Sequence, residues 1–261
     1  MNKENFIANY PYQKQFKFPV TKIENNNVYS FNEDIIGEYP LALILDDEHI
    51  NTFLCTPENL KELVVGYLKN KGYINSIDQL LKYDLDFENR TCHISINKNK
   101  KDSNEEQISL NPYDFLNASP VNNTDIKIKS QYIYKIMKQN LTSSKLFKDT
   151  GGVHSVAIFD NQSKEIISIK EDVARHNAMD KVIGYCVLNN ISLKDKIILV
   201  SGRISCEMIS KAAKSEIPIV ISKSAPTNLS IEISKKVNIS LVGFVRGERM
   251  CIYSNPERII F

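Results

Sequence analysis

The chain has 261 residues, with 33 Lys and Arg against 31 Asp and Glu, and so carries a formal net charge of only +2. This balance gives no global field for binding nucleic acid or a membrane surface, and any anion site must be local. The longest apolar runs, at 197–200 and 217–221, are too short to cross a bilayer, and no signal peptide is evident, so we expect a cytoplasmic protein.

The first half of the chain mixes strand-like and helical patterns. Residues 1–31 carry alternating, aromatic-rich stretches that suit short strands or an extended arm. The apolar run 41–45 and the segment 52–55 flank a polar turn, which predicts a pair of strands. A helix is expected after a capping Thr56, with proline at its first position and a stop at Gly72.

Two polar stretches separate this half from the next. Residues 97–107 lack an apolar anchor and predict a solvated excursion, and residues 111–125 read as a linker loop before a helical pattern. We therefore expect an α+β domain with its linker over 1–125 and an α/β domain over 126–261. The strands expected in the second domain lie near 153–159, 165–170, 196–201, 218–222 and 239–245, and its helices near 176–189, 205–215 and 227–237.

Polar residues gather where these strands end, which is where α/β sheets usually bind ligands. The first such segment leads into a helix and places Arg175 and His176 near its start, where free N–H groups and the helix dipole favour an anion. Lys181 follows on the same helix. The alternative is structural: Asp172 caps the helix, Glu171 pairs with Arg175, and His176 simply packs.

Three further segments repeat the design. Ser201 and Arg203 surround a glycine turn, Ser222 and Ser224 follow a buried strand, and 244–249 holds two arginines and an aromatic ring. Taken singly, each is equally consistent with a solvated arginine or an ordinary β-to-α connection. Four segments together predict one shared crevice for an anionic ligand. The predicted binding residues are Arg175, His176, Lys181, Ser201, Arg203, Ser222, Ser224, Phe244, Val245, Arg246, Gly247, Glu248 and Arg249.

Five ordered motifs, TGGVH, EDVARHNAMDK, SGRISCEMISKAA, SKSAPTNL and LVGFVRGERMCIY, resemble the FdhD family of formate dehydrogenase accessory proteins. With FLCTPENLKELVVGYL, the resemblance spans about residues 39–258. It implies a cytidine-deaminase-like α/β domain that passes sulfur from a cysteine desulfurase to the molybdenum or tungsten bis-pterin guanine dinucleotide cofactor of formate dehydrogenase or a similar molybdoenzyme. The segment 244–249 matches the stretch that binds this cofactor, and a homodimer is left open.

The sequence departs from the family pattern in two places. Ala174 stands where the family usually has glycine, and residues 117–125 lack the Cys-x-x-Cys of the family's mobile loop. Serine and asparagine cannot form a persulfide. Cys206 is the candidate thiol instead, because a helix start and the nearby Arg203 favour a thiolate there. The alternative is that Cys206 also packs in the core. The remaining cysteines, 55, 92, 186 and 251, are expected to pack structurally.

Three hypotheses follow from the sequence. The chain is an FdhD-like sulfur carrier that uses another thiol or a separate carrier, or it is a chaperone that binds the pterin cofactor without transferring sulfur. A hydrolytic zinc deaminase rests on fold analogy alone, and the His-x-Glu and Pro-Cys-x-x-Cys motifs of that class are absent from the sequence, so no metal site is expected.

Overall fold

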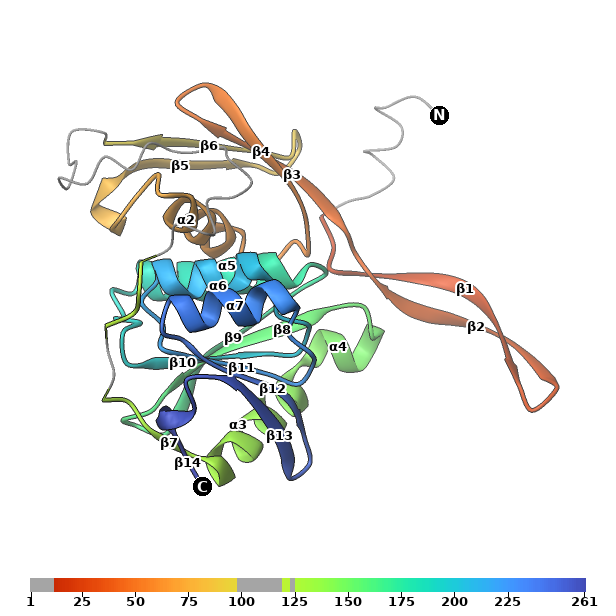
Figure 1. The fold of residues 1–261 in the computed structure, drawn as a ribbon. Helices are drawn as coiled ribbons and strands as arrows, with labels where there is room; N and C mark the ends of the chain where they lie inside the picture. Colours follow the sequence, from red (N-terminus) through yellow and green to blue (C-terminus); the bar gives the residue numbers. More distant parts are fainter. Residues whose placement is uncertain (1–11, 98–118, 123–124) are drawn as a thin grey trace.

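The computed structural model describes residues 12–97, 119–122 and 125–261 of a mixed α/β protein. Two sheet-based domains stack through their helices, and a long β-ribbon projects from their side (Figure 1). Among the described residues, no helix is both long enough and apolar enough to span a membrane.

The amino-terminal domain is a four-stranded sheet covered on one face by a helix. Its elements are β3 (Tyr39–Leu45), β4 (Glu48–Cys55), α2 (Leu60–Lys71), η1 (Ile77–Gln79), β5 (Leu80–Asp86) and β6 (Thr91–Ile96). The sheet order is β4-β3-β6-β5, and β3 pairs with β4 in antiparallel fashion, as the sequence predicts. Every second residue of β3 is buried because its inner face packs on α2.

The predicted start of α2 is wrong. The helix begins at Leu60 rather than at the proline, after an Asn59 with a left-handed backbone (φ 55°). Thr56 does not cap it: its N–H donates to Asp172 Oδ2 at 3.0 Å, and its hydroxyl accepts from the N–H of Val173 at 3.1 Å. Thr56, which the local sequence pattern predicts as a helix cap, therefore joins the two domains. The predicted stop at Gly72 is confirmed (φ 80°).

The carboxy-terminal domain is a six-stranded sheet with helices on both faces. Its order is β13-β12-β11-β10-β8-β9, and a short pair, β7 (Ile128–Lys129) and β14 (Ile259–Ile260), lies beside it. The remaining elements are α3 (Ser130–Ser143), α4 (Lys145–Thr150), β8 (His154–Asp160), β9 (Glu165–Asp172), α5 (Arg175–Leu188), β10 (Lys196–Val200), α6 (Cys206–Lys214), β11 (Ile219–Ser222), α7 (Asn228–Lys236), β12 (Ser240–Arg246), β13 (Arg249–Ser254) and η3 (Pro256–Arg258).

Successive residues of the central strands pack in two separate hydrophobic cores, one on each face of the sheet. Val156 and Ile198 face α5, α6 and α7, whereas Ala157 and Ile197 face α3 on the other side (Figure 1). The result is a three-layer sandwich whose strands and helices match the predicted alternation. The strand expected last, near 239–245, is followed by β13 and β14, which the sequence reading did not place.

The two domains meet where α2 crosses α5. A Cβ on Gly66 would lie 1.9 Å from the carbonyl oxygen of Asp180, and one on Gly184 would lie 1.9 Å from that of Glu62. The two backbones therefore touch, and only glycine fits at the crossing. Asn70 of α2 adds a hydrogen bond of 2.6 Å to Asp180 Oδ1, so polar contacts also hold the interface.

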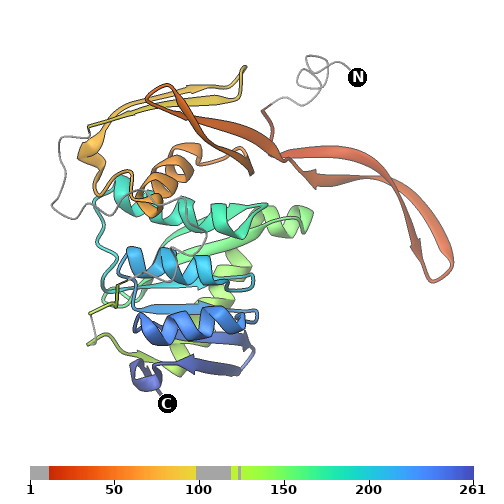
Figure 2. The same cartoon turned by 45° about the horizontal axis from the view of Figure 1, so that its top comes forward.

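Strands β1 (Gln15–Glu24) and β2 (Asn27–Ile36) form the projecting ribbon, which bears out the expectation of strands or an extended arm in this region. Both views show it leaving the body and extending into solvent (Figures 1 and 2). At its base the Tyr12 ring packs edge-on against the rings of Tyr39 and Phe87, with centroid distances of 5.5 Å and 4.6 Å. These contacts hold the base of the ribbon against the domain.

Candidate functional site

Sheet topology brings the four predicted polar segments to one edge. Strands β10, β11 and β12 are parallel, so their carboxyl ends and the turns that follow lie together. Strand β9 has the same direction, because β8 is antiparallel to both β9 and β10, and it delivers the start of α5 to that edge. We call the residues gathered there the carboxyl-edge cluster: His154, Arg175, Ser201, Gly202, Arg203, Ser222, Ser224, Phe244 and Arg246.

His154 lies within this cluster, although it is not among the binding residues predicted from the sequence. Because β8 is antiparallel to β10, its first residue lies beside the turn after β10. A Cβ on Gly202 would come within 2.9 Å of His154 Nδ1 and 3.6 Å of the Arg175 side chain. Gly202 thus lets the histidine and the arginine approach the turn backbone. Burial lowers the pKa of His154, and the charges of Arg175 and Arg203 lower it further.

The serine hydroxyls of the cluster hold the turns in place. Ser222 Oγ is fully buried, donates to the carbonyl of Gly202 at 2.7 Å and accepts from the N–H of Ser224 at 2.9 Å. Ser224 Oγ donates to the carbonyl of Ser201 at 3.0 Å, and Ser201 Oγ accepts from the N–H of Ser155. The buried Ser222 therefore supports the turns, while contact of the partly exposed Ser201 and Ser224 with a ligand stays a prediction.

The segment 244–249 forms a hairpin between β12 and β13. Gly247 takes the positive φ (58°) at the first turn position, and the arginines on either side of the turn are exposed. Arg246 lies 5.5 Å from the Phe244 ring centre and donates from Nε to the carbonyl of Lys223 at 3.3 Å. Phe244 is 38% exposed and has a left-handed backbone conformation (φ 53°), which is strained for an aromatic residue. Val245, by contrast, packs in the α3-side core.

Among the described residues, several buried polar atoms near the cluster lack hydrogen-bond partners, and two of them lie at helix starts. The Nε of Arg175 and the hydroxyl of Ser205, at the starts of α5 and α6, make no hydrogen bond within the part of the chain that the structure describes. Leaving such a group unsatisfied costs about 1–3 kcal/mol. A bound anion at these two helix starts would satisfy the arginine and the dipoles together.

His176 is neutral at physiological pH. Burial, the largest cause, acts together with the charges of Lys211 and Arg175 to lower its pKa to about 4, although Glu207 at 3.4 Å opposes them. The expected contact of His176 with an anionic ligand stays a prediction, with the neutral ring as a hydrogen-bonding group.

Lys181 lies outside the cluster. Its ammonium is fully buried, 2.6 Å from Asp172 Oδ2, and also donates to the carbonyls of Thr56 and Glu171. The expectation that it contacts the ligand is corrected, because every donor is committed to the domain interface. The structural alternative also fails in part: Glu171 binds the start of α4, accepting from Ser144 Oγ at 2.7 Å, rather than pairing with Arg175. Asp172 does accept from the N–H of Ala174 at 2.9 Å.

The five cysteines divide into two groups. Cys55, Cys92 and Cys186 are buried, and burial raises the pKa of each to about 12, so they are poor nucleophiles. Cys206 is partly exposed at the start of α6. Cys251 is exposed on β13, opposite Gly243, and the expectation that it packs is wrong. Cys251 lies two residues after the charged Arg249 on the same strand, so both side chains point to the same face. This spacing is the signal that could have revealed the exposure of Cys251.

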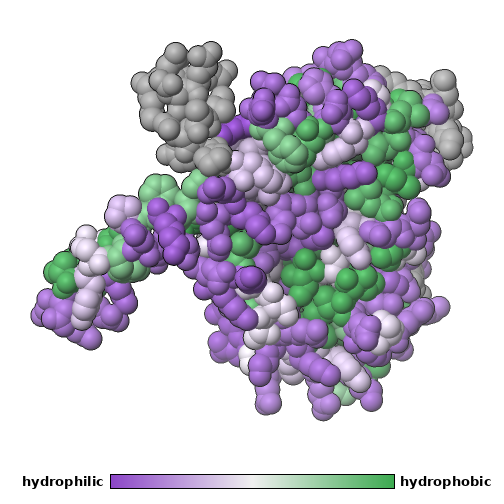
Figure 3. Space-filling model, turned by 180° about the vertical axis from the view of Figure 1, so that it is seen from behind, coloured by the Kyte–Doolittle hydropathy of each residue, from purple (hydrophilic) through white to green (hydrophobic). Residues whose placement is uncertain are grey.

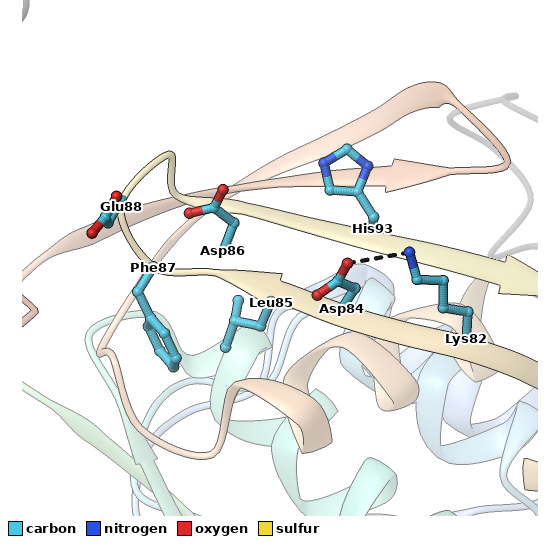
Figure 4. Close-up of a pocket in the computed structure, with 7 residues that line it drawn as sticks. All are labelled: Lys82, Asp84, Leu85, Asp86, Phe87, Glu88 and His93. Atoms are coloured by element: carbon cyan, nitrogen blue, oxygen red, sulfur yellow. Dashed lines mark ion pairs between the residues drawn. The ribbon is translucent and has the colours of Figure 1, made fainter.

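A separate depression of about 640 Å³ lies on the outer sheet face at β5 and β6 (Figure 4). Lys82 and Asp84 point toward each other across 3.2 Å, and both are exposed. The residues that line this depression include no buried polar atom without a hydrogen-bond partner, in contrast to the carboxyl-edge cluster. The described residues contain no group of three side chains suited to hold a metal ion.

The chain is thus a mixed α/β protein that carries cationic and aromatic groups at the carboxyl ends of its parallel strands. The chain belongs to the FdhD/NarQ family, which matches residues 36–260 and confirms the resemblance drawn from its motifs.

Individual relatives agree with this assignment. The chain is 34% identical over 254 residues to the sulfur carrier protein FdhD of Staphylococcus aureus strain MRSA252, covering 93% of this chain and 95% of that one. The protein of the same name from strain Newman is 33% identical with the same coverage. A crystal structure described as a formate dehydrogenase accessory protein from Desulfotalea psychrophila superposes with a TM-score of 0.81 at 26% identity, covering 95% of this chain and 100% of the other.

Proposed function

We propose that the protein is a sulfur carrier needed for formate dehydrogenase activity, which receives sulfur from a cysteine desulfurase and delivers it to a bis-pterin guanine dinucleotide cofactor carrying molybdenum or tungsten. The relatives, a sulfur carrier protein and a formate dehydrogenase accessory protein, support this proposal. One observation supports it above the others: Arg175, Arg203 and Arg246 gather at one strand edge, two of them exposed, beside an exposed aromatic ring. The cytidine-deaminase-like description and a cytoplasmic location belong to the same proposal.

The cofactor is cargo, and its chemistry suits the cluster. Its diphosphates are anions for the arginines and the free helix starts, and its guanine is a flat ring for Phe244. His154, neutral and wedged against Gly202, is placed to donate or accept one hydrogen bond at the same edge. Arg203 and Arg246 are the groups with room to move onto a ligand, since both are exposed.

Binding of guanosine diphosphate tests this part of the proposal. We expect Arg203→Ala and Arg246→Ala each to raise the dissociation constant about tenfold or more, because each removes a charge-assisted hydrogen bond. Lys82→Ala, which removes an exposed cation on the other domain, is the matched control and should change nothing. Equal affinity in all four proteins, measured by calorimetry, would remove the carboxyl-edge cluster as the binding site.

Sulfur carriage requires a thiolate, and Cys251 and Cys206 are the accessible ones. In the proposed step the thiolate attacks the outer sulfur of the desulfurase persulfide. A new sulfur–sulfur bond forms on this chain, and the desulfurase cysteine leaves as a thiolate, so the electrons balance without an added oxidant. Cys251 follows the 244–249 hairpin directly on β13, which favours it over Cys206.

Mass spectrometry after incubation with a cysteine desulfurase and cysteine tests this step. The wild type should gain one sulfur atom, Cys251→Ser should lose the adduct, and Cys206→Ser should keep it. A wild type that gains no sulfur would reject the carrier function.

The second candidate is a chaperone that binds the cofactor and transfers no sulfur. It is favoured by the absence of cysteine from residues 117–125 and by the burial of three of the five thiols. This candidate predicts intact nucleotide binding with no persulfide, and formate dehydrogenase activation that survives replacement of both accessible cysteines.

A further inference from the structure

The turn between β9 and α5 brings Arg175 to the carboxyl-edge cluster. Strand β9 ends at Asp172 and α5 begins at Arg175, so only Val173 and Ala174 lie between them. The first N–H groups of a helix have no partner within the helix, and Ala174, at the N-cap, has no side chain that could accept from them. The start of α5, and with it the place of Arg175, therefore depends on contacts from elsewhere.

Thr56 of the amino-terminal domain supplies three such contacts. Its hydroxyl accepts from the N–H of Val173 at 3.1 Å, and its N–H donates to Asp172 Oδ2 at 3.0 Å. Its carbonyl accepts from Lys181 Nζ at 3.0 Å. Thr56 is fully buried, so water does not replace one of these bonds when it is lost. Every polar group of this one residue is thus bound to the other domain.

Asn177 and Asp172 extend the same contact. Asn177 Nδ2 donates to the carbonyl of Leu54 at 2.8 Å and to Asp172 Oδ1 at 3.0 Å. The Asp172 carboxylate also accepts from the N–H of Ala174 at 2.9 Å. Hydrophilic residues occupy much of the surface where the two domains meet (Figure 3), which agrees with a junction held by polar contacts as well as by apolar packing. Leu54 and Thr56 therefore hold the turn from the amino-terminal domain.

We propose that Thr56 is a positioning residue for anion binding at the carboxyl-edge cluster, and that it acts through Arg175. The Arg175 side chain lies beside Gly202, where an added Cβ would come within 3.6 Å of its Cδ atom. Its Nε makes no hydrogen bond within the described part of the chain, so backbone and packing place this side chain. Loss of the Thr56 hydroxyl loosens the turn and lets Arg175 move away from an anionic group. This inference rests on the nucleotide binding proposed above and adds to it a residue of the other domain.

Calorimetric titration of the full-length protein with guanosine diphosphate tests the role of the hydroxyl. Thr56→Val keeps the size of the side chain and both backbone bonds, and it should raise the dissociation constant about fivefold. Thr56→Ser keeps the hydroxyl and should bind as the wild type does. Asn70→Ala is the matched control, because it removes a neutral hydrogen bond elsewhere in the same domain interface, and it should leave the dissociation constant unchanged.

A double variant shows whether the hydroxyl acts through Arg175. In an Arg175→Ala background, which should itself weaken binding, Thr56→Val should change the dissociation constant by less than about twofold. The same loss with and without Arg175 would mean that the hydroxyl only stabilises the fold, and it would overturn the proposal. So would wild-type affinity in Thr56→Val, or an equal loss in Asn70→Ala.

The two proposals fail in different ways. A wild type that binds no guanosine diphosphate would remove the carboxyl-edge cluster as the binding site, and the role of Thr56 with it, whereas binding that is insensitive to Thr56→Val removes the positioning role alone. If Thr56→Val does not fold, Asn177→Ala takes its place, because it removes the neighbouring bond to Leu54. Its loss of affinity should show the same dependence on Arg175, and additive losses there would equally overturn the proposal.

Discussion

Asp172 and Lys181 show how single residues join the two domains. Both are fully buried, 2.6 Å apart, and Asp172 also accepts hydrogen bonds from Thr56 and Asn177. Desolvating two charges is costly, so such a pair is tolerated only when its other polar atoms are satisfied, as they are here. Lys181 of the motif EDVARHNAMDK therefore stabilises the contact between the domains, whereas Arg175 and His176 lie at the start of α5.

We expect Lys181→Met to destabilise the protein by about 3–5 kcal/mol, because it leaves the Asp172 carboxylate buried without its counter-ion. Urea unfolding monitored by circular dichroism measures the loss. The double change Asp172→Asn with Lys181→Met removes both charges and should recover part of it. A single variant as stable as the wild type would show that the pair is not held as described.

His176 should make stability fall in mild acid. Its folded pKa of about 4 lies below the ordinary value of 6.5, so the unfolded chain takes up a proton first as pH falls. The free energy of unfolding should therefore be unaffected by His176 above about pH 6.5 and should fall between pH 6.5 and pH 4, by about 2 kcal/mol at pH 5. Urea unfolding of the wild type and of His176→Gln at pH 7 and pH 5 isolates the part of this loss that is due to His176. The same pH dependence in both proteins would contradict this account.

At the scale of elements, the crossing of α2 and α5 decides how the domains dock. Both helices carry a glycine at the contact, and each glycine meets the carbonyl backbone of the other helix. The sequence predicts both helices, and the glycine in each is visible, but their pairing depends on contacts between residues more than 100 positions apart. Local patterns such as capping residues and apolar stripes contain no such information. The same limit explains Thr56, whose capping signature is real but whose partner is the distant Asp172.

Gly66→Ala is expected to cost at least about 2 kcal/mol, because the added methyl group would force the two backbones apart. Gly72→Ala is the control: open space surrounds Gly72, and only its positive φ is strained, which costs about 1 kcal/mol. Thermal unfolding of both variants makes the comparison. A loss at Gly66 no larger than that at Gly72 would argue against close helix contact.

At the scale of the whole molecule, parallel strands gather residues that the sequence spreads over about a hundred positions. The carboxyl-edge cluster was predictable because polar residues follow each buried strand, and a parallel sheet collects strand ends. The roles within it were not predictable. Ser222 and Lys181 are buried and serve the structure. His154 belongs to the cluster because the antiparallel strand β8 lies beside β10, and the exposed Cys251 lies on the edge strand β13 that follows β12.

The central claim is that this edge performs the family's task in a chain without the loop cysteines. Complementation of a bacterial strain that lacks its own FdhD tests it most directly, scored by formate dehydrogenase activity at matched protein levels. We predict that the wild type restores activity, that Lys82→Ala matches it, and that Arg203→Ala loses most of it. Full activity with Arg203→Ala, or no activity with a well-folded wild type, would contradict the account.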